Sequence, residues 1–171
     1  PLRILDCRVQ TDAALDVHAD AILRGLGSGD ADHRWPIPRW TAADPAGNNR
    51  SEQTGRSSIA HLEARGLAIA DKRAPLELSL NLVRKRLRPA HNPGTPRLLI
   101  HPRCAALIQA LQKYHYPEHD PHTLEPAKDG PDHATDALRY LIVNLDKAFT
   151  TKRGCYLISS YAAPMDSSRR H

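Results

Sequence analysis

Two acidic residues and a histidine stand close together near residue 133, at a spacing that suits metal binding or proton transfer. Asp132, His133 and Asp136 lie in the stretch from Lys128 to Tyr140. Asp132 and Asp136 are four residues apart and His133 precedes Asp136 by three, so on a helix the three side chains can converge. Carboxylate and imidazole groups in that arrangement suit a divalent-metal site or general acid–base chemistry.

The same stretch has the features of a helix start. Pro131 suits the first helical turn, where its missing N–H is not needed, and Asp129 suits the cap. Acidic residues in a first turn are also common because they complement the helix dipole, so a purely structural role for the acids stays open.

The helix that would carry these residues is expected to have one apolar face. That face consists of Ala134, Leu138, Leu141 and Leu145, which recur at steps of four, three and four. Asp132, Asp136 and Arg139 fall on another face.

A second candidate carboxylate lies far upstream, at Asp44. The stretch 40–47 is a short apolar run that ends in Asp44, followed by Pro45 and Gly47. This pattern predicts a strand whose last residue projects a carboxylate from the C-terminal edge of a sheet, where ligands bind in open α/β folds. A plain Asp-Pro turn is the structural alternative.

Further strands are expected at 2–9, 67–70 and 97–100, because these short stretches are apolar or alternating and are flanked by turn residues. Helical spacing predicts helices over 14–26, 57–66, 74–88 and 103–116. The segment 74–88 also fits a strand, but Pro75 at a first turn favours the helix.

Together these stretches resemble a known family. The chain reads AADPAG and RSEQTGRSSIAHLEARG, then PRLLIHPRCAALIQALQKYHY, then KDGPDHATDALRYLIVNL. This series is similar to the C-terminal nuclease domain of the large terminase subunit of tailed bacteriophages, over residues 2–149. The motif Asp-His-x-x-Asp-Ala-Leu-Arg-Tyr is its most specific part.

The resemblance implies an α/β domain over residues 1–150, with a ribonuclease-H-like mixed sheet flanked by helices, and a C-terminal extension at 151–171. It implies a metal-dependent endonuclease that cuts concatemeric DNA during packaging. Its partners would be double-stranded DNA, a packaging ATPase domain upstream in the parent chain, the small terminase subunit and the portal.

The resemblance also implies the site. Two Mg²⁺ or Mn²⁺ ions would activate water and stabilise the leaving oxygen, and such ions need carboxylates from different elements. Asp44 and Asp136 are the expected catalytic and metal-binding acids, Asp132 is an additional metal ligand, and His133 is a catalytic residue.

One element of the family pattern is missing. The family carries a further essential Asp on its first strand, in a Gly-rich context that this chain lacks, whereas Leu2–Val9 resembles the third strand. The first two strands are therefore expected upstream, which would leave an exposed sheet edge and apolar faces, and an inactive fragment. No Gly-x-x-x-x-Gly-Lys-Ser/Thr motif occurs either, so the packaging ATPase that the resemblance implies is expected upstream in the parent chain.

Basic and polar residues outside the acidic stretches are candidate DNA contacts. The chain has 24 Lys and Arg against 19 Asp and Glu, a net charge of +5 that suits a polyanionic partner. Clustered cations displace the counterions of DNA, although cations at a helix C-terminus are also stabilising on their own. The candidates are Arg50, Ser51, Arg84, Lys85, Arg86, Arg88 and Lys128.

A zinc site is a rival hypothesis. His101 and Cys104, and then His115 and His119, have spacings typical of zinc ligands. The intervening segment is expected to be a continuous helix, which would separate the two pairs by about 15 Å. Cys104 is therefore expected to be a small core residue.

The composition of the chain indicates a cellular location. No run of 18 apolar residues and no signal segment occur, and three scattered cysteines favour reduced thiols, so a cytoplasmic location is expected. Two other functions stay open: a different ribonuclease-H-like nuclease such as a resolvase or transposase core, and a non-catalytic, DNA-binding prophage remnant.

Overall fold

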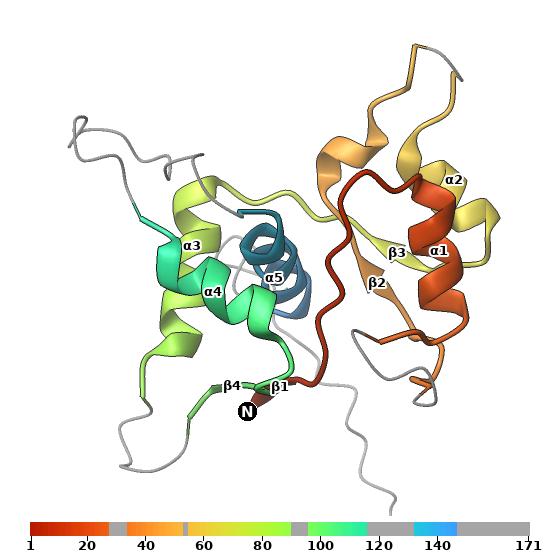
Figure 1. Cartoon of the computed structure of the whole chain (residues 1–171). Coiled ribbons are helices and arrows are strands. Elements are labelled where there is room, and N and C mark those ends of the chain that lie inside the picture. Colours follow the sequence, from red (N-terminus) through yellow and green to blue (C-terminus); the bar gives the residue numbers. More distant parts are fainter. Residues whose placement is uncertain (28–33, 53–54, 90–95, 116–131, 147–171) are drawn as a thin grey trace, which may run out of the picture.

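Helix α5 (Asp132–Leu145) lies at the centre of the molecule, with the other elements arranged around it (Figure 1). The computed structural model describes residues 1–27, 34–52, 55–89, 96–115 and 132–146, and the structural statements below concern those residues. α5 packs against α3 (Leu76–Leu87) and α4 (Ala105–Lys113) on one side and contacts β2 (Thr41–Ala42) on the other. It therefore joins the two halves of the fold.

Four short strands form two parallel pairs. β1 (Leu2–Ile4) pairs with β4 (Leu98–Ile100), and β2 pairs with β3 (Ile69–Ala70). No ladder joins the two pairs within the described residues, because each of these strands has a partner on one side only. The α/β class is thus confirmed, whereas the expected single mixed sheet is not seen among the described strands.

The remaining elements lie near the β2–β3 pair. α1 (Leu15–Leu23) and α2 (Ser58–Ala64) lie on that side of the molecule (Figure 1). A short 3₁₀ helix, η1 (Pro45–Asn48), follows β2 and contacts α2. α2 begins where the Ser57 hydroxyl accepts the N–H of Ala60, a side-chain cap of the kind that starts helices.

The helices expected from spacing are present with shorter bounds. α1, α2, α3 and α4 lie within the stretches 14–26, 57–66, 74–88 and 103–116. The ambiguous segment is helical, and Pro75 directly precedes α3, where a missing N–H costs nothing. The first strand is shorter than expected, because it pairs with β4 over three residues only and the chain then turns away.

The core lies between α5, α3, α4 and the β1–β4 pair. It consists of buried side chains from these elements: Leu82, Val83, Leu98, Cys104, Leu107, Leu138, Ile142 and Val143. Cys104 is fully buried there, as expected for a small core residue.

The apolar face expected for α5 is only partly right. Leu138 is buried, but Leu145 is exposed, whereas Ile142, Val143 and Arg139 are buried. The reason is that α3 and α4 both pack against α5, so the buried surface is broader than a single stripe and centres on Leu138 and Ile142. Arg139 was expected on the polar face but is buried, and it is bonded to Asp136 and Ser79.

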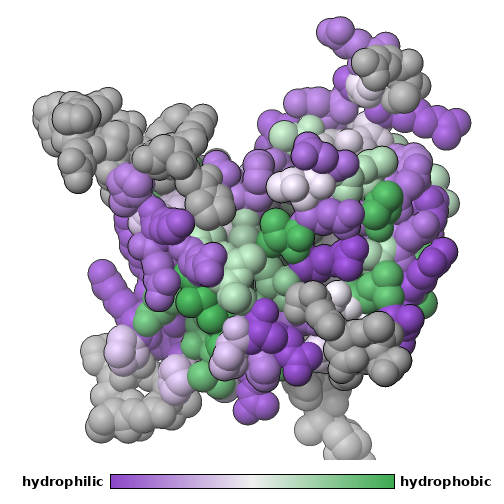
Figure 2. All heavy atoms as spheres, viewed as in Figure 1, coloured by the Kyte–Doolittle hydropathy of each residue, from purple (hydrophilic) through white to green (hydrophobic). Residues whose placement is uncertain are grey.

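Some apolar side chains remain uncovered in the described ranges. Figure 2 shows hydrophobic groups reaching the surface across the middle of one face, between larger hydrophilic areas. The exposed large hydrophobic residues are Leu5, Val9, Val17, Ile37, Trp40, Leu87, Leu99 and Leu145. None of the helices in the described ranges is both long and apolar enough to cross a membrane.

Several expectations fall on residues outside the described ranges. They concern the Asp129 cap and Pro131, the candidate DNA contact Lys128, the candidate zinc ligand His119, and the extension at 151–171.

Candidate active site

Asp44 lies just beyond the end of β2 and starts the next element. The β2–β3 ladder extends to Ala43, whose N–H donates to the Ala70 carbonyl at 3.0 Å. Asp44 then caps η1, with its Oδ1 accepting the N–H of Ala46 at 2.8 Å. The expectation that Asp44 is the last strand residue is therefore wrong by two positions, but its carboxylate does lie at the C-terminal edge of a parallel pair.

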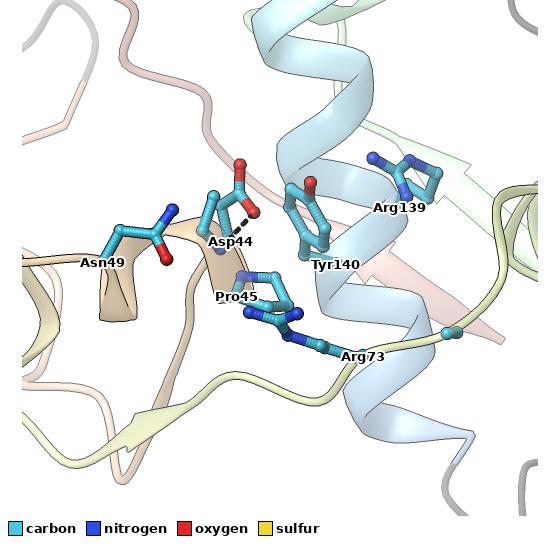
Figure 3. Close-up of a pocket in the computed structure, with 8 residues that line it drawn as sticks. Asp44, Pro45, Asn49, Arg73, Arg139 and Tyr140 are labelled. Atoms are coloured by element: carbon cyan, nitrogen blue, oxygen red, sulfur yellow. Dashed lines mark hydrogen bonds between the residues drawn. The ribbon is translucent and has the colours of Figure 1, made fainter.

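A pocket of about 420 Å³ lies between Asp44 and α5. Its walls come from η1, from the segment that leads into α3, and from α5, so two sequence motifs more than ninety positions apart meet there. Figure 3 shows Asp44 and Tyr140 next to each other across this pocket. The lining residues are Asp44, Pro45, Ala46, Asn49, Arg73, Ala74, Arg139 and Tyr140.

Tyr140 is the group on α5 that interacts with Asp44. Burial raises the pKa of the Tyr140 phenol; the nearby Arg139 guanidinium lowers it, and the neighbouring Asp44 carboxylate raises it, so the net direction is upward. The Tyr140 side chain therefore faces the Asp44 carboxylate across the pocket.

Arg139 connects the pocket to Asp136. Its Nε donates to Asp136 Oδ1 at 3.1 Å, and one terminal nitrogen donates to the Ser79 hydroxyl of α3 at 3.2 Å. Burial lowers the pKa of Arg139, but the Asp136 carboxylate outweighs it and leaves the pKa raised. The guanidinium also lies 4.4 Å from the centre of the Tyr140 ring.

Asp136 itself does not line the pocket. It lies one helical turn before Tyr140, so its backbone is about 6 Å from that of Tyr140 along α5. Asp136 is paired with Arg139, whose side chain lines the pocket next to the Tyr140 ring. Asp136 is therefore connected to the pocket of Asp44 through Arg139 and Tyr140.

The expected convergence of Asp132, His133 and Asp136 is not formed. The His133 side chain is 96% exposed, and its Nδ1 lies 3.8 Å from Asp132 Oδ1. No group of three potential metal ligands of the His, Cys, Asp or Glu type occurs within the described residues.

The candidate DNA contacts separate into two classes. Arg50, Ser51, Arg84, Lys85 and Arg88 are exposed on loops or on α3, and the structure leaves their proposed role as a prediction. Arg86 has a structural role instead, because its Nε donates to Asp146 Oδ2 at 3.0 Å and both side chains are largely buried. This pair fixes the end of α3 to the end of α5.

The described residues do not form the zinc site that the spacing of His101 and Cys104 suggested. Cys104 is in the core, and its thiol lies 3.8 Å from the Ile4 carbonyl. The Nδ1 of His101 accepts the backbone N–H of Arg103 at 3.2 Å. This pair therefore has partners of its own.

Three ionisable residues of the pocket, Arg73, Arg139 and Tyr140, were not anticipated as site residues. Arg139 and Tyr140 lie within the most specific motif of the sequence, so the motif carried a signal that a search for acids alone passes over. Arg73 gave no signal at all, since it stands in a short connection between two elements.

The types of side chain near the pocket suit a divalent ion, but there are too few of them for a complete ligand set within the described residues. Asp44 and Asp136 supply hard carboxylate oxygens from two different elements, which is what Mg²⁺ and Mn²⁺ prefer. Of these two carboxylates, Asp44 lines the pocket and Asp136 does not.

Comparison with known proteins finds no matching family model, no similar curated protein and no similar solved structure.

Proposed function

We propose that the chain carries part of the active site of a metal-dependent DNA endonuclease of the ribonuclease-H-like type, similar to the nuclease domain of a phage DNA-packaging terminase. The observation that carries the proposal is the meeting of the Asp-Pro-x-Gly and Asp-His-x-x-Asp-Ala-Leu-Arg-Tyr motifs in one pocket. The proposal places the protein in the cytoplasm of a bacterial host, with double-stranded DNA as substrate.

Two further observations support it. Asp44 follows the C-terminal end of a parallel strand, which is where catalytic side chains gather in open α/β sheets. Leu5 and Val9, which follow β1, are about half exposed, as expected if further strands of the parent protein cover this side.

The roles follow from the contacts. Asp44 and Asp136 would hold Mg²⁺ or Mn²⁺, which supplies an activated water and stabilises the leaving oxygen when bound. Tyr140 would orient the Asp44 carboxylate from across the pocket, and Arg139 would orient Asp136 through its Nε. Arg139 is in turn fixed by Ser79, so its position does not depend on the substrate.

The test is nicking of supercoiled plasmid in Mn²⁺. We would assay this chain and a form extended upstream by the two strands that the resemblance implies, because a further acid is expected there. Asp44→Asn and Asp136→Asn are the test variants, and Glu63→Gln on the exposed surface of α2 is the charge-matched control.

We expect nicking by the extended form, lost by about 10³-fold in either Asp variant and retained in the control. Metal-independent binding of duplex DNA without nicking by either form would favour the DNA-binding remnant instead. Nicking that survives both Asp substitutions would exclude this pocket as the catalytic site.

A further inference from the structure

The pocket beside Asp44 contains a positive charge that the described residues do not compensate. Arg139 is paired with Asp136, and Asp44 interacts with the Ala46 N–H and Tyr140. Arg73 is exposed, lines the pocket, and has no hydrogen bond or ion pair with any other residue that the structure describes. Its guanidinium is thus available to an anion that enters the pocket.

The backbone that presents Arg73 is fixed on two sides. Just before it, the Asp71 carboxylate accepts a hydrogen bond from Asn48 of η1. The N–H of Lys72 donates to the Asn144 side chain of α5 at 3.3 Å, and Asn144 itself is buried and donates to the Tyr140 carbonyl at 2.9 Å. The connection between β3 and α3 is therefore attached to both walls of the pocket.

This attachment gives Arg73 a defined direction. Figure 3 shows its side chain extending from the β3–α3 connection to Pro45, with the guanidinium on the same side of α5 as Asp44 and Tyr140. An anchored arginine loses less freedom on binding than one on a mobile loop. A planar guanidinium with several N–H donors matches the paired oxygens of a phosphate.

We infer that Arg73 binds a phosphate group of the DNA backbone beside Asp44, and so positions the strand in the pocket. The inference rests on the proposed function, because it takes DNA as the substrate. Arg73 would act through binding, whereas the carboxylates would act in hydrolysis.

The experiment measures binding separately from cleavage. Fluorescence anisotropy with a short labelled DNA duplex, in EDTA so that no cleavage occurs, gives the dissociation constant over a series of salt concentrations. Arg73→Gln is compared with Arg24→Gln, which removes an equal charge from the C-terminal end of α1, outside the pocket lining. Circular dichroism and thermal unfolding confirm that each variant is folded.

We expect Arg73→Gln to bind about tenfold more weakly than the unsubstituted protein. It should also lower the slope of log K against log salt by about 0.9, the value of one released counterion. Equal affinity and slope for the Arg73 and Arg24 variants would overturn the inference and leave the proposed function standing. Absence of duplex binding by the unsubstituted protein would instead count against the proposed function.

A second variant keeps the test decisive if Arg73→Gln does not fold. Arg73→Lys retains the charge but not the planar donor group, so the salt slope should stay unchanged while affinity falls by about threefold. Unchanged affinity in Arg73→Lys would then overturn the assignment of a phosphate-binding guanidinium.

Discussion

The Tyr140 side chain of α5 faces the Asp44 carboxylate across the pocket, although the two residues belong to motifs far apart in the chain (Figure 3). The Asp44 carboxylate accepts the Ala46 N–H within its own turn, and Tyr140 is its neighbour across the pocket. The surroundings of this carboxylate therefore include α5, and each motif forms part of the other's environment.

Tyr140→Phe tests whether Tyr140 orients Asp44. The variant removes the hydroxyl but keeps the ring, so we expect a loss of stability of about 1 kcal/mol and a roughly tenfold lower nicking rate. Unfolding by urea and the plasmid assay measure the two effects. An unchanged nicking rate would show that Asp44 is held without Tyr140.

The burial of Tyr140, together with the neighbouring Asp44 carboxylate, predicts a pH dependence of stability. Because the pKa of Tyr140 is raised in the folded protein, its contribution to stability is complete below the pKa of an unfolded tyrosine, about 10, and is lost as the pH rises through the folded value. Ultraviolet absorbance should therefore show a tyrosine ionisation at higher pH than that of free tyrosine. The Asp44→Asn variant should shift that ionisation to lower pH.

The shifted face of α5 predicts unequal effects for two similar side chains. Ile142 is fully buried in the core, whereas Leu145, which spacing placed on the apolar face, is exposed. We expect Ile142→Ala to lose about 2–5 kcal/mol in the free energy of unfolding and Leu145→Ala to lose under about 1 kcal/mol. Equal losses would contradict the observed helix orientation.

Arg139 is held by two partners, and their contributions can be separated. Ser79→Ala removes one acceptor of Arg139 together with a hydroxyl that donates to the Leu76 carbonyl at 2.7 Å, so we expect a loss of about 1 kcal/mol. Arg139→Met leaves Asp136 without its cation, so it should cost more than Ser79→Ala. Asp136 is partly open to water, which keeps the expected loss at roughly 2–3 kcal/mol, below that of a fully buried pair. Urea unfolding of both variants tests this order.

A second pH effect concerns the contact between α1 and α2. The pKa of Asp16 is lowered, first by its hydrogen bond with His61 and also by the charge of Arg65. A lowered folded pKa contributes stability above the unfolded value, near 4, that is lost as the pH falls through the folded value. The difference in Tm between the unsubstituted protein and Asp16→Asn should therefore shrink from pH 5.5 to pH 3.

Much of the element order follows from the sequence alone. The helices α1 to α4 and the strand β4 lie where spacing and turn residues indicate them, because each has a local signal such as Pro75 before α3. Asp44 and the helix of Asp136 were likewise correctly placed on separate elements, since an Asp-Pro-x-Gly turn and a helix start both have local patterns.

The remaining features depend on packing between distant segments. The buried face of α5 is set by two neighbouring helices at once, which an apolar pattern along one helix does not reveal. In the sequence, Arg86 belongs to a basic cluster. In the structure it is paired with Asp146, which lies sixty positions away. Arg73 lines the pocket, and the two residues before it are bonded to Asn48 and Asn144, which are remote in sequence.

The most direct test of the account is a double-substitution cycle in the plasmid-nicking assay, with Asp44→Asn, Asp136→Asn and both together, in whichever form of the protein cuts. If the two carboxylates serve one centre, each single substitution should remove most of the activity, about 10³-fold, and the double variant should lose little more. Losses that multiply, or a single variant that cuts at the unsubstituted rate, would contradict the claim that these two motifs form one catalytic site.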